Sequence, residues 1–280
     1  MDPRSLPPNN PTVGTVVVRE NVVHDDVLAV EFPLFQRINA RQPIILMRTP
    51  KTSMDSDHNL AYGFLYGERV IESLDDVRAI QHCDDAQNPM RSHTLNVSLE
   101  SGCSLKSIQE RRDPIYSACG ACGRASLDDL TSRESHPIRH PKPSTQWICT
   151  LPEKLGEHQQ YFNVTGGVHG AALFSQKGEM VAVDEDVGRH NAVDKVIGSI
   201  LRQESQELFG MILVVTSRLS FDLVQKAARA NLAAVAGVGA ASSLAVELAR
   251  KFGIHLFSFT HEHRVNYHDP NHASPAHSIR

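Results

Sequence analysis

The chain has 280 residues, of which 41% are hydrophobic and 21% charged, and a formal net charge of −4. These values are typical of a globular protein that can bury a sizeable core in one large domain or two lobes. The small negative charge does not predict nucleic acid or an anionic membrane as a partner. No apolar run reaches the ~18 residues of a membrane span, and the polar, proline-rich start lacks a signal peptide's apolar core.

The first half of the chain contains short strand and helix signals in alternation. Aliphatic and β-branched residues predict strands over 15–23, 42–50 and 93–100. Apolar positions at helical spacing predict a helix over 57–71, and "SLDDVRAI" over 73–80 predicts the start of a second short helix. Between 111 and 143 the periodicity disappears, which indicates a functional loop or a linker.

The second half is more regular. We expect a helix over 151–162, and "GAALFS" and "EMVAVD" flank the turn "QKG", which predicts an antiparallel hairpin. The remaining elements alternate as helix and strand, which favours parallel pairing with right-handed crossovers. Their expected ranges are 187–201 (helix), 211–217 (strand), 221–231 (helix), 232–239 (strand), 242–253 (helix) and 254–260 (strand).

The predicted fold class is α/β, with a smaller α+β N-terminal lobe and a three-layer C-terminal lobe built on a mixed sheet. We expect disordered ends, two lobes and a flexible loop between the lobes. Their ranges are 1–12 (disordered), 13–110 (N-terminal lobe), 111–145 (loop), 146–268 (C-terminal lobe) and 269–280 (disordered).

The five cysteines include one close pair, Cys119 and Cys122, in the sequence "ACGACGR". An odd number of cysteines, three of them isolated, is not typical of a disulfide framework and indicates a reducing, cytoplasmic compartment. Cys83, Cys103 and Cys149 are expected to be small core residues without a role in the chemistry.

Three interpretations of the cysteine pair compete. His136 and His140 complete a zinc-finger spacing, but Pro137 would interrupt the helix that must present both histidines. A thioredoxin-like dithiol needs a buried strand before the first cysteine and a helix after it, whereas the approach "RRDPIYSA" is polar and broken by a proline. We favour a mobile thiol carrier, because a glycine follows each cysteine and nearby arginines stabilise the thiolate; we expect no zinc.

Several polar motifs surround this pair in the predicted fold. "TSRLS" places Ser217 and Arg218 where a strand ends and a helix begins, a position at which α/β sheets hold phosphates. "DEDVGRHNAVDK" carries Arg189 and His190, and its charged residues are either a site or a solvated helix face with an Asp186–Arg189 pair. "FTHEHR", residues 259–264, follows the last predicted strand and is either part of a site or a polar loop.

Taken together, "SACGACG", "TGGVHGAAL", "EDVGRHNAVDKVIG", "TSRLSFDLVQKAA" and "MRTP…LAYGFLYGE" resemble the motifs of the formate dehydrogenase accessory sulfurtransferase family, FdhD. The resemblance runs from about Val13 to Tyr267. It implies a cytidine-deaminase-like C-terminal lobe. Deaminase activity itself is not expected, since Ala171 stands where the His-x-Glu motif beginning at His169 would need its glutamate.

The resemblance implies a sulfur carrier, a sulfurtransferase acting through a cysteine persulfide. Such a protein takes sulfur from a cysteine desulfurase and delivers it to the molybdenum or tungsten of bis(molybdopterin guanine dinucleotide), the cofactor that formate dehydrogenase needs. Cys119 would carry the persulfide and Cys122 would be its relay or resolving partner. A chaperone that binds the cofactor without moving sulfur is the alternative.

By position in the family's motifs, the cofactor contacts would come from "FTHEHR", "TSRLS" and "DEDVGRHNAVDK". GDP should bind as a fragment of the cofactor, with Arg218 and Arg264 as phosphate partners. His263 stands where the family commonly has a glycine before the arginine. Members of the family form homodimers, and formate dehydrogenase is the implied client. The implied cofactor-binding residues are Phe259, Thr260, His261, Glu262, His263, Arg264, Ser217, Arg218, Arg189 and His190.

Overall fold

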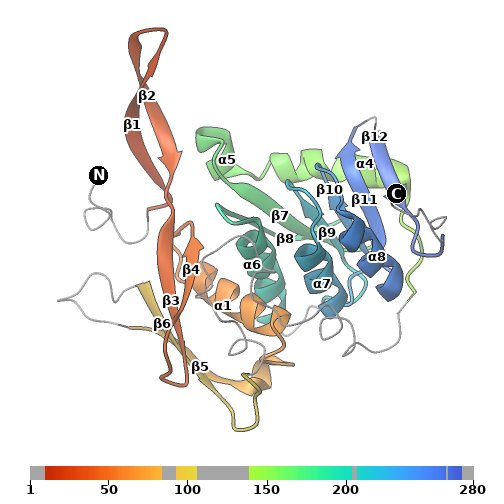
Figure 1. Ribbon diagram of the computed structural model, residues 1–280, viewed down its shortest axis with the longest axis horizontal. Coiled ribbons are helices and arrows are strands. Elements are labelled where there is room, and N and C mark those ends of the chain that lie inside the picture. Colours follow the sequence, from red (N-terminus) through yellow and green to blue (C-terminus); the bar gives the residue numbers. More distant parts are fainter. Residues whose placement is uncertain (1–9, 84–92, 106–138, 204–206, 263, 273–280) are drawn as a thin grey trace, which may run out of the picture.

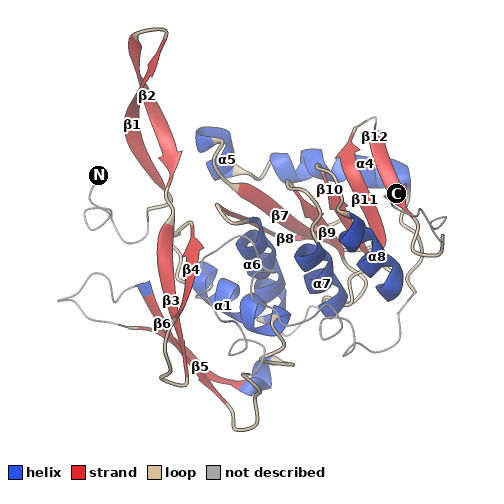
Figure 2. Cartoon of the chain, viewed as in Figure 1, coloured by secondary structure: helices blue, strands red, loops and turns tan. Residues whose placement is uncertain are grey.

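The computed structural model describes residues 10–83, 93–105, 139–203, 207–262 and 264–272, and the strands within these ranges form three sheets. Figure 1 and Figure 2 show a projecting two-stranded ribbon, a four-stranded sheet and a six-stranded sheet with helices packed on it. The protein therefore has the mixed α/β architecture with mixed sheets that the sequence predicts. None of the described helices is long and apolar enough to cross a membrane.

The ribbon consists of β1 (Thr12–Arg19) and β2 (Val22–Ala29), paired antiparallel in register from Thr12 opposite Ala29 to Arg19 opposite Val22. The single strand predicted over 15–23 is wrong. Glu20 and Asn21 adopt φ values of 51° and 65° and form a two-residue turn, and a turn with two positive φ angles matches the twist of the strands it joins.

The four-stranded sheet has the order β4-β3-β6-β5 and carries α1 (Asp55–Gly67) on one face. Leu34, Leu60 and Leu65 are fully buried between them. The strands predicted over 42–50 and 93–100 and the helix over 57–71 are confirmed, whereas β3 was not predicted. The bounds of the strands are β3 (Phe32–Ile38), β4 (Ile44–Arg48), β5 (Val77–His82) and β6 (Thr94–Leu99).

The second short helix predicted over 73–80 is one turn long. Ser73 caps a 3-10 turn, η2 (Leu74–Asp76), in a reciprocal capping arrangement with Asp76. The cap gave a correct start signal, but the following residues alternate in burial and form β5 instead of continuing the helix.

The six-stranded sheet has the order β12-β11-β10-β9-β7-β8. Strands β9, β10 and β11 are parallel, and the other three pairings are antiparallel. The hairpin and the parallel strands are confirmed, while β12 was not predicted. The bounds are β7 (His169–Phe174), β8 (Met180–Asp186), β9 (Ile212–Val215), β10 (Ala234–Gly237), β11 (His255–His261) and β12 (Arg264–His268).

Helices cover both faces of this sheet and make three layers (Figure 1). One face packs against three predicted helices, α6 (Arg189–Leu201), α7 (Phe221–Arg229) and α8 (Ser243–Phe252). The other face packs against α4 (Thr145–Gly156), and α5 (Gln160–Thr165) follows it. The single helix predicted over 151–162 is therefore two helices.

The two larger sheets are joined by the contact of α1 with α6 (Figure 1). Two glycines allow the helices to approach to backbone contact. A Cβ atom on Gly63 would overlap the carbonyl oxygen of Asp194, and one on Gly198 would overlap the carbonyl oxygen of Asn59. The two halves thus form one packed body, with the ends of β8 and β4 beside this contact.

Candidate functional site

The functional motifs gather at one edge of the six-stranded sheet. The parallel strands β9, β10 and β11 all end there, and the antiparallel register of β7 with β8 and β9 places the start of β7 at the same edge. The backbone N–H of Thr216 donates to the carbonyl of Gly170 over 3.0 Å. We call this region the strand-end edge; it is where open α/β sheets bind ligands.

Gly239, which follows β10, joins the loops of the two neighbouring strands. Its N–H donates to the carbonyl of Ser217 at 3.2 Å, and its carbonyl accepts from the N–H of Phe259 at 3.0 Å. A Cβ atom on Gly239 would lie 2.9 Å from Cα of Arg218, so only glycine allows this approach. The structure therefore brings the "TSR" and "FTHEHR" motifs together, as the proposed nucleotide pocket requires.

The end of β11 is an irregular turn. Phe259 has a φ of 50°, which is rare for a bulky residue and is characteristic of sites where the surroundings impose strain. The hydroxyl of Thr260 donates to the carbonyl of Phe257, and the guanidinium of Arg264 lies 5.2 Å from the centre of the Phe259 ring. This cation–π contact holds Arg264 at the strand-end edge, although its side chain is exposed.

Arg189 and His190 lie at the start of α6, where the helix dipole favours an anion. Nε2 of the buried His190 is 3.8 Å from Oδ2 of Asp222 in the first turn of α7. Burial, and secondly the charge of Arg189, lower the pKa of His169 at the start of β7, so that this histidine is neutral at pH 7.

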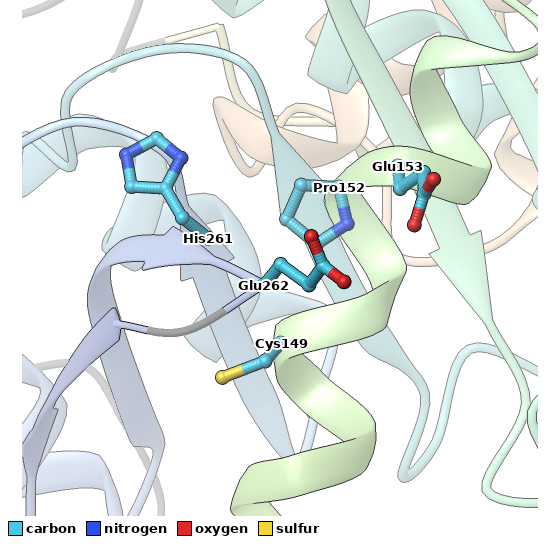
Figure 3. A pocket seen from close by; sticks show the side chains of 5 residues that line it. All are labelled: Cys149, Pro152, Glu153, His261 and Glu262. Atoms are coloured by element: carbon cyan, nitrogen blue, oxygen red, sulfur yellow. The ribbon is translucent and has the colours of Figure 1, made fainter.

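A pocket of about 390 Å³ opens between α4 and the β11–β12 hairpin (Figure 3). His261 and Glu262 line it from the hairpin, and Cys149, Pro152 and Glu153 line it from α4. Pro152 has no N–H, so the helical hydrogen bond to the carbonyl of Ile148 is not made. Burial raises the pKa of Cys149, which keeps its thiol protonated.

The charged residues of "EDVGRHNAVDK" do not form a solvated face. Asp186 is fully buried, and its Oδ2 lies 2.6 Å from Nζ of the fully buried Lys195. The same carboxylate accepts from the backbone N–H groups of Thr49 and Gly188 and from the amide of Asn191. The solvated face with an Asp186–Arg189 pair, one of the two alternatives that the sequence left open, is therefore wrong, because Lys195 occupies the carboxylate and ties α6 to the end of β4.

A second buried ion pair lies beside this network. Nζ of Lys226 on α7 is 2.6 Å from Oδ1 of Asp194 on α6. We refer to the residues Thr49, Asp186, Asn191, Asp194, Lys195 and Lys226 as the junction network. The two carboxylates and the two lysines of this network stabilise each other inside the molecule. Asp186, Asp194 and Lys195 of the "DEDVGRHNAVDK" motif therefore hold the fold together.

Three of the predicted site residues lie outside the described residues, namely Cys119, Cys122 and His263. The remaining cysteines, Cys83, Cys103 and Cys149, are free and half-buried. Gly239, Asp222 and the α4 side of the pocket were not predicted. A glycine directly after a strand in "AGVGA" was the available signal for Gly239, whereas nothing local in the sequence links α4 to residues a hundred positions later.

The fold and the strand-end edge define an α/β protein with an arginine-bearing site at the ends of its parallel strands. The chain belongs to the FdhD/NarQ family, whose model matches residues 29–273. It is 42% identical to the sulfur carrier protein FdhD of Corynebacterium efficiens, over 87% of this chain and 89% of that protein. It is 38% identical to the protein of the same name from Sulfolobus acidocaldarius, over 86% and 88% of the two chains.

The fold is also similar to a solved structure. A crystal structure described as a formate dehydrogenase accessory protein from Desulfotalea psychrophila matches with a TM-score of 0.65 and 24% identity. The match covers 92% of this chain and 96% of that one, so the two proteins share their overall fold.

Proposed function

We propose that this protein is a sulfur carrier required for formate dehydrogenase activity. It takes persulfide sulfur from a cysteine desulfurase in the cytoplasm and delivers it to the molybdenum or tungsten of bis(molybdopterin guanine dinucleotide). Membership of a family whose curated relatives are named sulfur carrier protein FdhD carries this proposal. The arginines of the strand-end edge support the cofactor as the acceptor.

The sulfur would travel on the cysteine pair. The thiolate of Cys119 attacks the terminal sulfur of the desulfurase persulfide, a new S–S bond forms, and the desulfurase cysteine leaves as a thiolate. Attack of the Cys122 thiolate on the inner sulfur of the Cys119 persulfide then releases the terminal sulfur as sulfide for the metal. This step oxidises the two cysteines to a disulfide, which a thiol reductant must reduce before the next transfer.

The strand-end edge would bind the guanine dinucleotide arms of the cofactor, and GDP as a fragment of them. Arg218 and Arg264 would pair with phosphates, and the start of α6 with Arg189 would add a partial positive charge. His261 and Glu262, which also line the pocket beside α4 (Figure 3), would contact the cofactor from the turn between β11 and β12. Within this proposal the C-terminal lobe is cytidine-deaminase-like, and the protein works as a homodimer.

Persulfide formation is the direct test. The purified protein is incubated with a cysteine desulfurase and radiolabelled cysteine, and protein-bound sulfur is measured before and after thiol reduction. We expect about one labile sulfur per chain in the wild type and none in Cys119→Ala. Cys103→Ala is the matched control, because burial raises the pKa of that thiol and makes it a poor nucleophile.

The outcomes separate the candidate functions. Labelling of wild type but not of Cys119→Ala, with transfer to a sulfur-free formate dehydrogenase, supports the carrier. An unlabelled protein that still binds the cofactor and activates the enzyme would instead be a cofactor chaperone. Full activation by Cys119→Ala would contradict the carrier role.

A further inference from the structure

Large apolar side chains are exposed together on the β1–β2 ribbon. Seven of the nine exposed large hydrophobic residues among the described ones lie on the ribbon or on α5, which lies beside β2 (Figure 1). Val16, Val18 and Val23 are each about two-thirds exposed, at 64%, 68% and 65%. An isolated two-stranded ribbon with such a surface is only marginally stable in water, so further strands or another packed element must stabilise it.

Each outer edge of the ribbon has one backbone N–H group that a side chain already covers. Because a two-residue turn makes Arg19 and Val22 a hydrogen-bonded pair, the backbone groups of Gly14, Val16 and Val18 point away from β2. On β2 the outward N–H of Val27 already donates to the carboxylate of Asp26 at 2.9 Å. On β1 the backbone N–H of Thr12, the first residue of the strand, donates to Oδ1 of Asn10 at 3.2 Å.

The side chains along the two edges differ in charge. β2 carries Asp25 and Asp26 in its centre, and acidic residues on an edge strand oppose pairing with a like strand. β1 has no charged residue before Arg19 at its end, and its centre is "TVVV". Among the described strands β1 pairs only with β2, so its other edge is available for a further strand.

We propose that β1 pairs antiparallel with β1 of a second copy, which joins two ribbons into one four-stranded sheet across a twofold axis. The axis passes beside Val16, so that Val16 of one copy lies opposite Val16 of the other. In this register Gly14 lies opposite Val18, which gives the larger side chain room, and Arg19 lies opposite Val13. Two Asp-bearing β2 strands remain on the outside.

The strand itself indicates a second copy as the occupant. An isologous contact requires a surface that is complementary to itself. The uncharged, β-branched centre of β1 meets this condition, because antiparallel pairing of β1 with itself places no like charges opposite each other. Val18 and Val23 then extend a continuous apolar strip across the axis.

This inference gives a surface to the homodimer that the proposed function includes, and it is tested by mass in solution and not by sulfur transfer. Sedimentation velocity of the full chain should show a dimer for the wild type. Val16→Glu and Val16→Lys, each alone, should sediment as monomers at the same concentration, because two like charges meet on the axis. An equimolar mixture of the two variants should recover the dimer.

Val22→Glu is the matched control, since Val22 is also exposed but lies on β2. It should remain dimeric, and all variants should keep the circular dichroism spectrum of the folded wild type. A wild-type monomer would overturn the proposal. A dimer that persists in both Val16 variants, or monomers that do not recover on mixing, would show that the twofold axis lies elsewhere. Persulfide formation by a monomeric variant would leave the sulfur-carrier function standing.

Discussion

The junction network and the strand-end edge both contain charged residues from motifs that suggested a site in the sequence, yet these residues are in opposite environments. Asp186 and Lys195 are fully buried and hydrogen-bonded to the backbone of the other half. Arg218 and Arg264 are exposed, and the contacts the structure records for Arg264 include an aromatic ring. Charge density in a motif therefore does not identify a site. Burial and partner saturation separate residues that hold the fold from residues that can hold a ligand.

The largest expected effect on stability comes from removing the carboxylate of Asp186, which tests whether the buried residues hold the fold. Asp186→Ala leaves the Lys195 ammonium buried and removes the acceptor for Thr49, Gly188 and Asn191. Loss of one partner of a buried ion pair costs about 3–5 kcal/mol. We expect the free energy of unfolding in urea to fall by that amount, and soluble expression to decrease.

The double variant Asp186→Ala/Lys195→Met is the control for this prediction. Because it removes the unpaired charge, it should be more stable than Asp186→Ala alone by about 1–3 kcal/mol. Equal stability of the two variants would mean that the backbone hydrogen bonds, and not the ion pair, hold the junction.

The helix contact at the junction gives the next largest effect. Gly198→Ala places a methyl group onto the carbonyl oxygen of Asn59 and forces α1 and α6 apart. Overpacking of this kind costs about 1–3 kcal/mol. Gly156→Ala, at the end of α4 with no atom near the added methyl group, should change the unfolding midpoint little. Similar shifts for both alanine variants would contradict the close packing at Gly198.

A third prediction concerns the strand-end edge alone. Arg218→Ala and Arg264→Ala should each weaken GDP binding by about tenfold to a hundredfold in calorimetry, because a charge-assisted phosphate contact contributes about 1.5–3 kcal/mol. Neither should lower the urea midpoint, since both side chains are exposed. Arg78→Ala removes an exposed arginine from β5 and is the control. Unchanged affinity in both edge variants would place the nucleotide elsewhere.

The sequence predicted the α/β alternation of the second half well because its strands and helices have clear periodicity and caps. It missed β3. It also missed the turn at Glu20 and Asn21, because neither residue is a glycine and both are held at positive φ by the twist of the ribbon. It also left open whether the charged residues of "DEDVGRHNAVDK" form a site or a solvated face, and it did not predict the burial of Asp186 and Lys195. Their burial depends on α1 and β4, more than a hundred residues earlier, and no local pattern records such a contact.

For the site, local signals located the ends of β9 and β11 correctly. The sequence motifs gave Ser217, Arg218 and Phe259, and the parallel pairing explains why they meet. The hydrogen bonds of Gly239 to Ser217 and Phe259, and the side of the pocket formed by α4, could be recognised only from the three-dimensional structure. Motifs thus identified the strand ends that carry the candidate residues, but not the helix that lines the pocket beside them.

The smallest expected effect is a pH dependence of the N-terminal half. His93 is buried against the Phe32 ring, and its Nδ1 lies 3.3 Å from a guanidinium nitrogen of Arg48, which forms a bidentate pair with Asp57. Burial, and then the Arg48 charge, lower the pKa of His93 to about 4, and Asp57 only partly offsets this. An ordinary histidine in the unfolded chain has a pKa of about 6.5.

Since the unfolded chain binds this proton more readily, the stabilisation by neutral His93 is complete above about pH 6.5 and is lost as the pH falls towards 4. Between pH 7 and pH 5 the loss from this one group should be about 1–2 kcal/mol. His93→Gln keeps an acceptor for Arg48 but does not titrate, so its free energy of unfolding should fall less over this range by the same amount. The other histidines are present in both proteins and cancel in the difference. His24→Gln, which alters an exposed ribbon residue, should follow the wild-type curve, and a His93→Gln curve parallel to the wild type would show that His93 does not sense pH.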